Sequence, residues 1–138
     1  MADAKLRTHK FHDLSHFGLR ISIGVLLIVH SLGKFDSGSM GFFSSIGLPS
    51  GMALMIGLLE LIGGALLIVG VLTRIAASLL AIEMLTIMIY LKKLQSFSGK
   101  NGLELELLIF VVLLTIIVLG PGSISISHLV KKIPRFLQ

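Results

Sequence analysis

The chain has 138 residues, of which 54% are hydrophobic and only 14% are charged, with a net charge of +5 and a mean hydropathy of +0.99. A small soluble domain leaves too much of its surface in water to hide this share of apolar side chains, so the composition predicts an integral membrane protein. The chain has no cysteine, which excludes disulfides, thiolate metal sites and cysteine nucleophiles.

Four apolar segments approach the length of about 20 residues that a helix needs to cross a bilayer. They cover residues 17–33, 51–72, 75–91 and 103–119. Leucine-rich and isoleucine-rich runs without a period of two favour helices over a membrane β-barrel. A very short turn separates the second and third segments, so we expect them to be antiparallel neighbours. The predicted fold is all-α, an integral membrane up-down four-helix bundle.

This fold divides the chain into an N-terminal tail (1–16), a four-helix domain (17–122) and a basic C-terminal tail (123–138). The N-terminal tail alternates basic and apolar residues, and it either forms an interfacial helix with Phe11 and Leu14 in lipid or is simply solvated. Residues 34–50, rich in glycine and serine, and residues 92–102 are predicted to be outer loops.

Lysines and arginines are distributed unequally between the two faces of the predicted bundle. One face carries eight of the twelve: Lys5, Arg7, Lys10, Arg20, Arg74, Lys131, Lys132 and Arg135. The other carries Lys34, Lys92, Lys93 and Lys100. The positive-inside rule therefore predicts a multi-pass protein of the cell membrane with both termini in the cytoplasm. The positive charge fits lipid headgroups better than nucleic acid, because no groove-reading motif is present.

Ionisable side chains within a membrane span are costly, and each is a candidate functional residue. Glu60 lies near mid-bilayer in the second segment. His30 and Lys34 share one helical face at the outer end of the first segment. Glu104 opens the fourth segment at the outer surface, and Arg20 lies near the cytoplasmic boundary, where it either binds a ligand or snorkels into the interface.

Glu60 has two interpretations: a proton-transfer or ligand-binding group, or a structural ion pair with Lys34 or Arg74. Its depth favours Lys34 as the partner. Glu83 is a weaker candidate, since the methionines that follow it usually fill a core. Glu106 is expected only to interact with the helix dipole. The glycines around Glu60 are predicted to be positions of close helix approach; they are Gly57, Gly63, Gly64 and Gly70.

Several short motifs occur in a recognisable order along the four segments. They are Leu19-Arg20, His30-x-x-Gly33-Lys34, Gly47-Leu48-Pro49, Glu60-Leu61-x-Gly63-Gly64, Gly70-x-x-Thr73-Arg74, Asn101-Gly102-Leu103-Glu104 and Gly120-Pro121-Gly122-x-x-Ser125. Their order and spacing resemble the DoxX family of small four-span membrane proteins over residues 18–127. One departure is that this family commonly has an acid two residues after the last serine, where this chain has Ser127.

The resemblance implies a membrane subunit of a redox complex that oxidises sulfur compounds or thiols and is linked to quinone. We therefore predict partnership with larger membrane or redox subunits, in the bilayer and without nucleic acid. Glu60 and His30 would transfer protons, while Arg20, Lys34 and Glu104 would bind quinone or another ligand, with no metal. The sequence does not determine which cofactor the chain binds, whether it forms a homo-oligomer or whether it is an enzyme. The alternatives are a non-catalytic accessory subunit and, less favoured, a small transporter.

Overall fold

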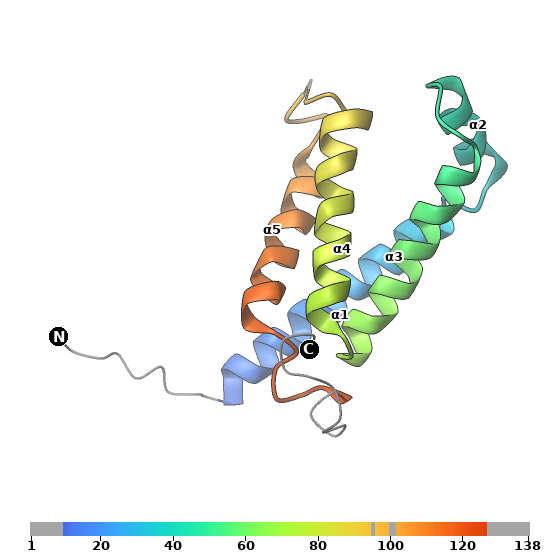
Figure 1. Cartoon of the computed structure of the whole chain (residues 1–138). Coiled ribbons are helices and arrows are strands. Elements are labelled where there is room, and N and C mark those ends of the chain that lie inside the picture. The colour runs from blue at the N-terminus through green and yellow to red at the C-terminus, as the bar shows by residue number, and fades with distance from the viewer. Residues whose placement is uncertain (1–9, 95, 100–101, 127–138) are drawn as a thin grey trace.

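The computed structural model describes residues 10–94, 96–99 and 102–126, and within these ranges every regular element is helical (Figure 1). The elements are α1 (Lys10–Leu32), α2 (Ser37–Ser45), α3 (Gly51–Val69), α4 (Thr73–Thr86), the π-helix η1 (Ile87–Leu91) and α5 (Glu104–Leu119). Since η1 continues α4 directly, the two form one rod. The predicted all-α class is confirmed.

Three helical segments are long and apolar enough to cross a membrane, namely Phe11–Leu32, Gly51–Val69 and Thr73–Leu91. Helix α5 is strongly apolar but has only 16 residues, about 24 Å of helix against a hydrocarbon core of about 30 Å. The prediction of an all-α membrane protein is confirmed. Among the described residues, three of the four predicted spans reach membrane length, and α5 is shorter. Helix α5 packs along α4 as a shorter fourth member of the bundle.

The long helices associate mainly as two pairs, α1 with α3 and α4 with α5. A tight turn of three residues after α3, Gly70 to Leu72, makes α3 and α4 antiparallel neighbours, as predicted. Gly70 ends α3 in the left-handed region, with φ of 74°, which suits a residue without a Cβ. In Figure 1 the α3–α2 arm and the α4–α5 pair diverge toward the end of the molecule where α2 lies.

Glycines bring the helices of the first pair into backbone contact. A Cβ on Gly64 of α3 would lie 2.7 Å from the carbonyl oxygen of Gly24 on α1, and the converse distance is also 2.7 Å. A Cβ on Gly63 would lie 2.8 Å from Leu80 Cδ1 on α4. Small residues let helices approach closely in a membrane, where lipid tails are as apolar as the core. The predicted role of Gly63 and Gly64 is confirmed.

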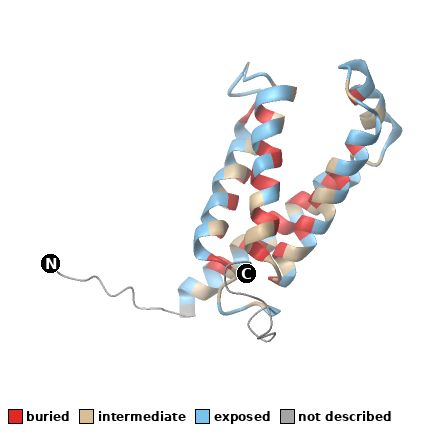
Figure 2. Ribbon diagram, viewed as in Figure 1, coloured by how far each residue is buried: buried red, intermediate tan, exposed pale blue. Residues whose placement is uncertain are grey.

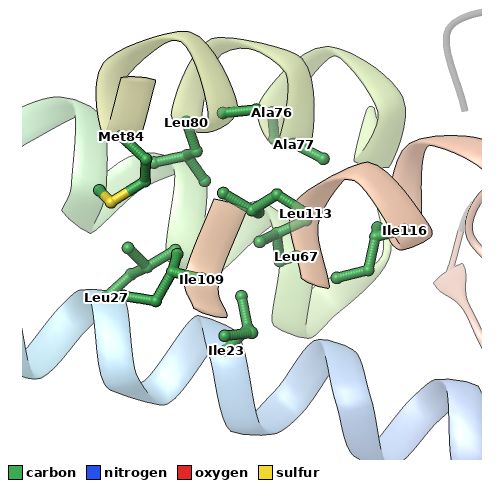
Figure 3. Packing of buried hydrophobic residues seen from close by; sticks show 11 residues of the cluster. Ile23, Leu27, Leu67, Ala76, Ala77, Leu80, Met84, Ile109, Leu113 and Ile116 are labelled. Carbon is green, nitrogen blue, oxygen red and sulfur yellow. The ribbon is translucent and has the colours of Figure 1, made fainter. Parts of the chain in front are cut away.

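The apolar core lies where all four long helices meet. Figure 3 shows Leu27 of α1, Leu67 of α3, Leu80 of α4 and Leu113 of α5 converging on one another. Buried residues follow the inward faces, while the outward faces of the same helices are exposed and apolar (Figure 2). That pattern suits a bundle whose outer surface contacts lipid.

Two segments differ from their prediction. Residues 34–50, predicted as a loop, contain helix α2, which packs against α3 and buries Phe43 to 5% exposure. Burial of this aromatic ring outweighs the poor helix propensity of glycine and serine. Helix α1 begins at Lys10, so residues 10–16 of the predicted tail continue the first helix. The rest of that tail and residues 127–138 lie outside the described residues.

Candidate functional site

A buried ion pair joins the end of α1 to the middle of α3. Lys34 follows α1, and its Nζ lies 2.5 Å from Oε1 of Glu60, whose side chain is only 1% exposed. Gly57, one helical turn before Glu60, makes room for the stem of Lys34, because a Cβ there would lie 3.2 Å from Lys34 Cβ. The predicted choice of Lys34 over Arg74 as the partner of Glu60 is confirmed. Oε2 of Glu60 has no hydrogen-bond partner within the described residues.

A second acid, Glu83 of α4, lies level with Glu60. Gly63 of α3 faces Leu80 of α4, and the two helices are antiparallel. Glu60 precedes Gly63 by three residues and Glu83 follows Leu80 by three, so the two acids lie side by side. Glu83 is 7% exposed and close enough for Glu60 and Lys34 to act on it electrostatically. Neither of its carboxylate oxygens has a hydrogen-bond partner in the described chain. Two buried acids thus lie near one lysine, which forms an ion pair with Glu60.

A second ion pair, at the same end of the bundle, joins the end of η1 to the start of α5. Lys92 follows η1, and its Nζ lies 2.8 Å from the carboxylate of Glu106 on α5. The same ammonium donates a hydrogen bond to the Gly102 carbonyl at 2.6 Å. Together these contacts fasten the start of α5 to the end of the α4–η1 rod. π-Helical turns of this kind often occur at functional sites.

A cavity of about 390 Å³ lies between these two ion pairs. Its walls come from all the helices: His30, Gly33, Lys34, Ser39, Phe42, Phe43, Ile56, Glu60, Met84, Ile87, Leu91, Lys92, Glu106 and Ile109. The rings of Phe42 and Phe43 meet edge to face, with centroids 5.9 Å apart. Ligand sites of this size are usually apolar with a few convergent polar groups, and this cavity has that composition.

The structure brings together three of the five predicted site residues. His30, Lys34 and Glu60 all line the cavity, with His30 at its exposed margin. Arg20 lies ten residues before His30 on α1, about 15 Å along the helix. It is therefore at the opposite end of the bundle, where it contacts Ile124. Glu104 is exposed and is not among the lining residues.

Sequence reasoning gave little weight to three groups that lie at this end. Glu83 was identifiable, since it and Glu60 stand at similar distances from the α3–α4 turn. Glu106 and Lys92 were not, because the ion pair that joins them depends on how the 92–103 loop folds. Met84 and Met88, which follow Glu83, are buried, as expected of methionines that fill a core.

A bundle of apolar helices with a partly charged cavity at one end defines a helical membrane protein with a candidate ligand site. The sequence pattern of the DoxX family matches residues 16–93, from α1 through η1, and the chain belongs to this family. The match includes His30, Lys34, Glu60 and Glu83 and ends before Glu106.

A curated relative is also similar over most of its length. The protein named "Putative oxidoreductase CatD" from Bacillus subtilis (strain 168) is 33% identical over 103 residues, covering 73% of this chain and 77% of that protein. No solved structure matches the chain.

Proposed function

We propose that this chain is an integral membrane subunit of a redox complex, and that a quinone binds in the cavity beside the Lys34–Glu60 pair. The observation that carries the proposal is one cavity that combines apolar walls with the buried ion pair of Lys34 and Glu60. A second buried acid, Glu83, lies next to this pair but does not line the cavity. The description of CatD as an oxidoreductase supports a redox role.

The lining residues suit the chemistry of a quinone ring. A quinone carbonyl needs a hydrogen-bond donor beside an apolar slot. The Lys34 ammonium and the His30 imidazole are donors of this cavity, as are Lys92 and Ser39. Phe42, Ile56 and Ile87 supply apolar surface. Glu60 lines the cavity and Glu83 lies next to it on α4. Together they carry three carboxylate oxygens without hydrogen-bond partners among the described residues, and these can hold a proton beside the cavity.

The electrons come from a partner subunit that oxidises a thiol or a reduced sulfur compound. Oxidation of two thiols to a disulfide releases two electrons and two protons, and reduction of a quinone to a quinol consumes two of each. In this scheme Glu60, Glu83 and His30 deliver protons to the ring oxygens. The chain itself has no cysteine to undergo the thiol step.

We further propose a location in the cell membrane with both termini in the cytoplasm. The predicted tail 1–16, of which residues 10–16 begin α1, and the tail 123–138 then flank the domain 17–122 on the inner side, with α5 as the fourth crossing of the bilayer. Along the sequence, the N-terminal segment, the α3–α4 turn and the C-terminal segment carry eight of the twelve lysines and arginines, which supports this orientation. The cavity would then open toward the outer half of the bilayer.

The test is to purify the protein with its native partners in mild detergent and to quantify extracted quinone by chromatography. Wild type and Glu104→Gln, which loses an exposed carboxylate outside the cavity, should retain quinone and reduce it at the same rate. Glu60→Gln should assemble with the same partners yet lose most of the quinone-reducing activity.

A second candidate function, a non-catalytic accessory subunit, is favoured by the way both ion pairs fasten helices together. It predicts partner subunits, no bound quinone, and activity of the complex that survives Glu60→Gln. That result would overturn the proposed quinone site.

A further inference from the structure

At the opposite end of the bundle, a buried arginine has no carboxylate partner among the described residues. The Arg20 side chain on α1 is 0% exposed. Its Nη2 donates a hydrogen bond to the Ile124 carbonyl, while Nε and Nη1 have no hydrogen-bond partner among the residues the structure describes. No ion pair in this part of the chain includes it. The snorkelling interpretation of Arg20 is therefore wrong, since a snorkelling head reaches water.

Two more basic side chains contact the same segment after α5. A Cβ on Gly120 would lie 3.4 Å from Nε and Nη2 of Arg74, and a Cβ on Gly122 would lie 2.6 Å from Nδ1 of His16. Nε of Arg74 and Nε2 of His16 are buried without hydrogen-bond partners in the described ranges. Three basic groups therefore surround residues 120–124.

The start of α4 adds further donors at this place. Thr73, the first residue of α4, is fully buried, and its hydroxyl has no hydrogen-bond partner within the described chain. The first backbone N–H groups of a helix also lack intrahelical acceptors, and they carry the positive end of the helix dipole. An arginine next to a helix N-terminus is unfavourable unless an anion neutralises both.

Among the described residues, no acid forms an ion pair with Arg20 or Arg74. Five of the seven belong to the other half of the bundle: Asp36, Glu60, Glu83, Glu104 and Glu106. Asp13 lies 3.9 Å from His12 and one helical turn before His16, on which it acts electrostatically. It forms no ion pair with Arg20 or Arg74 within the described residues, and Asp3 is outside them. Burial of an unpaired charge is costly, so an anion from outside the chain would stabilise this end.

A second cavity, of about 470 Å³, adjoins the cluster. It is lined by Phe17, Ile68, Val69, Ser123, Ile124, Ser125 and Ile126. Two of these residues contact Arg20 directly, because Ile124 accepts its hydrogen bond and the Phe17 ring centroid lies 5.8 Å from its Cζ. The cavity is mainly apolar, which suits the upper part of an acyl chain next to a charged headgroup.

We propose that Arg20, Arg74, His16 and Thr73 form a binding site for a phosphate oxyanion, supplied by the headgroup of an anionic phospholipid or by free phosphate. Guanidinium groups, a hydroxyl and a helix N-terminus are the groups that proteins use for phosphate. This site shares no residue with the quinone cavity, so each proposal can fail without the other.

The test compares ligands with and without a phosphate. The melting temperature of the full chain in dodecyl maltoside, a nonionic detergent, is followed by far-ultraviolet circular dichroism, since the chain has no tryptophan. Dioleoylphosphatidylglycerol should raise the melting temperature, and dioleoylglycerol, with the same acyl chains, should not. If inorganic phosphate raises it too, relative to chloride at equal ionic strength, the source is free phosphate; if not, it is the lipid headgroup. Both results support the site.

The variants decide whether the cluster is responsible. Because Arg20 is fully buried and its replacement risks misfolding, Arg74→Gln, at a half-buried position, is the primary variant, and it should weaken phosphate binding about tenfold. Lys93→Gln removes an exposed positive charge at the other end and should change nothing. Equal weakening by both, or no effect of any phosphate ligand on wild type, would overturn the proposal. It would equally be overturned if Asp3→Asn lowered the melting temperature in the absence of any phosphate ligand, since Asp3 would then be the counter-charge.

Discussion

The two ends of the bundle bury their basic side chains in opposite ways. At the α2 end, Lys34 and Lys92 are each held by a glutamate of the same chain. At the other end, Arg20 and Arg74 are packed against glycines and backbone, without an ion pair among the described residues. Burial alone therefore does not define the role of a basic residue in this protein. The α2 end is balanced by its own carboxylates, whereas the other end gains stability from an outside anion.

The largest expected effect comes from removing both buried acids near Lys34, its partner Glu60 and the neighbouring Glu83. The double variant Glu60→Gln/Glu83→Gln leaves this lysine buried without a carboxylate and should lower the free energy of unfolding by about 3–5 kcal/mol. Glu60→Gln alone should cost clearly less, because Glu83 then supplies the counter-charge. Titration with sodium dodecyl sulfate in mixed micelles, followed by circular dichroism, measures both values.

Adding Lys34→Met to the double variant should restore much of the lost stability, because no buried charge then remains unpaired. Strict additivity of the two single changes would show that Glu83 does not share the lysine, and the described balance at the α2 end would be wrong.

A smaller loss of stability is expected from a change at the contact between Gly24 of α1 and Gly64 of α3, which lies between the two ends of the bundle. Gly64→Leu places a side chain against the Gly24 carbonyl oxygen, and overpacking of this kind costs about 1–3 kcal/mol. Ile62→Leu on the same helix is the control, since Ile62 is 56% exposed. If both variants melted at the same temperature, the α1–α3 contact would not hold the ends together.

Loss of the second ion pair should matter less than loss of the first. Lys92 and Glu106 are 25% and 14% exposed, so solvent screens their attraction more than that between Lys34 and Glu60. We expect Lys92→Met to lower the free energy of unfolding by about 1 kcal/mol or less. A cost as large as that of Lys34→Met would show that both pairs are equally important for the cavity.

Labelling of introduced cysteines tests which end faces outward and should leave stability unchanged. The chain has no native cysteine, so single cysteines at Ser39 and Ser98 can be probed with an impermeant maleimide in intact cells. Both should be labelled, while cysteines at Ala2 and Gln138 should be labelled only after lysis. Labelling of either terminal cysteine in intact cells would reverse the proposed orientation.

The Lys34–Glu60 pair, the glycine contacts of α3 and the turn after α3 were predictable from residue type, depth in the bilayer and segment length. Glu60 and Lys34 are both costly to bury in lipid without a partner, and they lie at compatible depths. These two facts predicted an ion pair between them. The glycines on either side of Glu60 predicted close packing because only a residue without a side chain allows such an approach. The antiparallel turn between α3 and α4 followed from its length alone.

The opposite end was not predictable, because its contacts join residues far apart in the chain. Arg20 bonds to Ile124, which is 104 residues later. Nothing in the pattern around Arg20 distinguishes a buried guanidinium from a snorkelling one. The short length of α5 and the formation of α2 likewise depend on tertiary packing, which local propensity does not report.

Photoaffinity labelling with an azidoquinone most directly tests the claim that the cavity beside Glu60 is the redox site. After illumination of the purified complex, peptide mass spectrometry locates the label. The label should lie on α2, on α3 near Ile56 or on η1 near Ile87, and its yield should fall strongly in Glu60→Gln but not in Glu104→Gln. Labelling confined to Phe17 and residues 123–126, or equal yield in both variants, would contradict the quinone site.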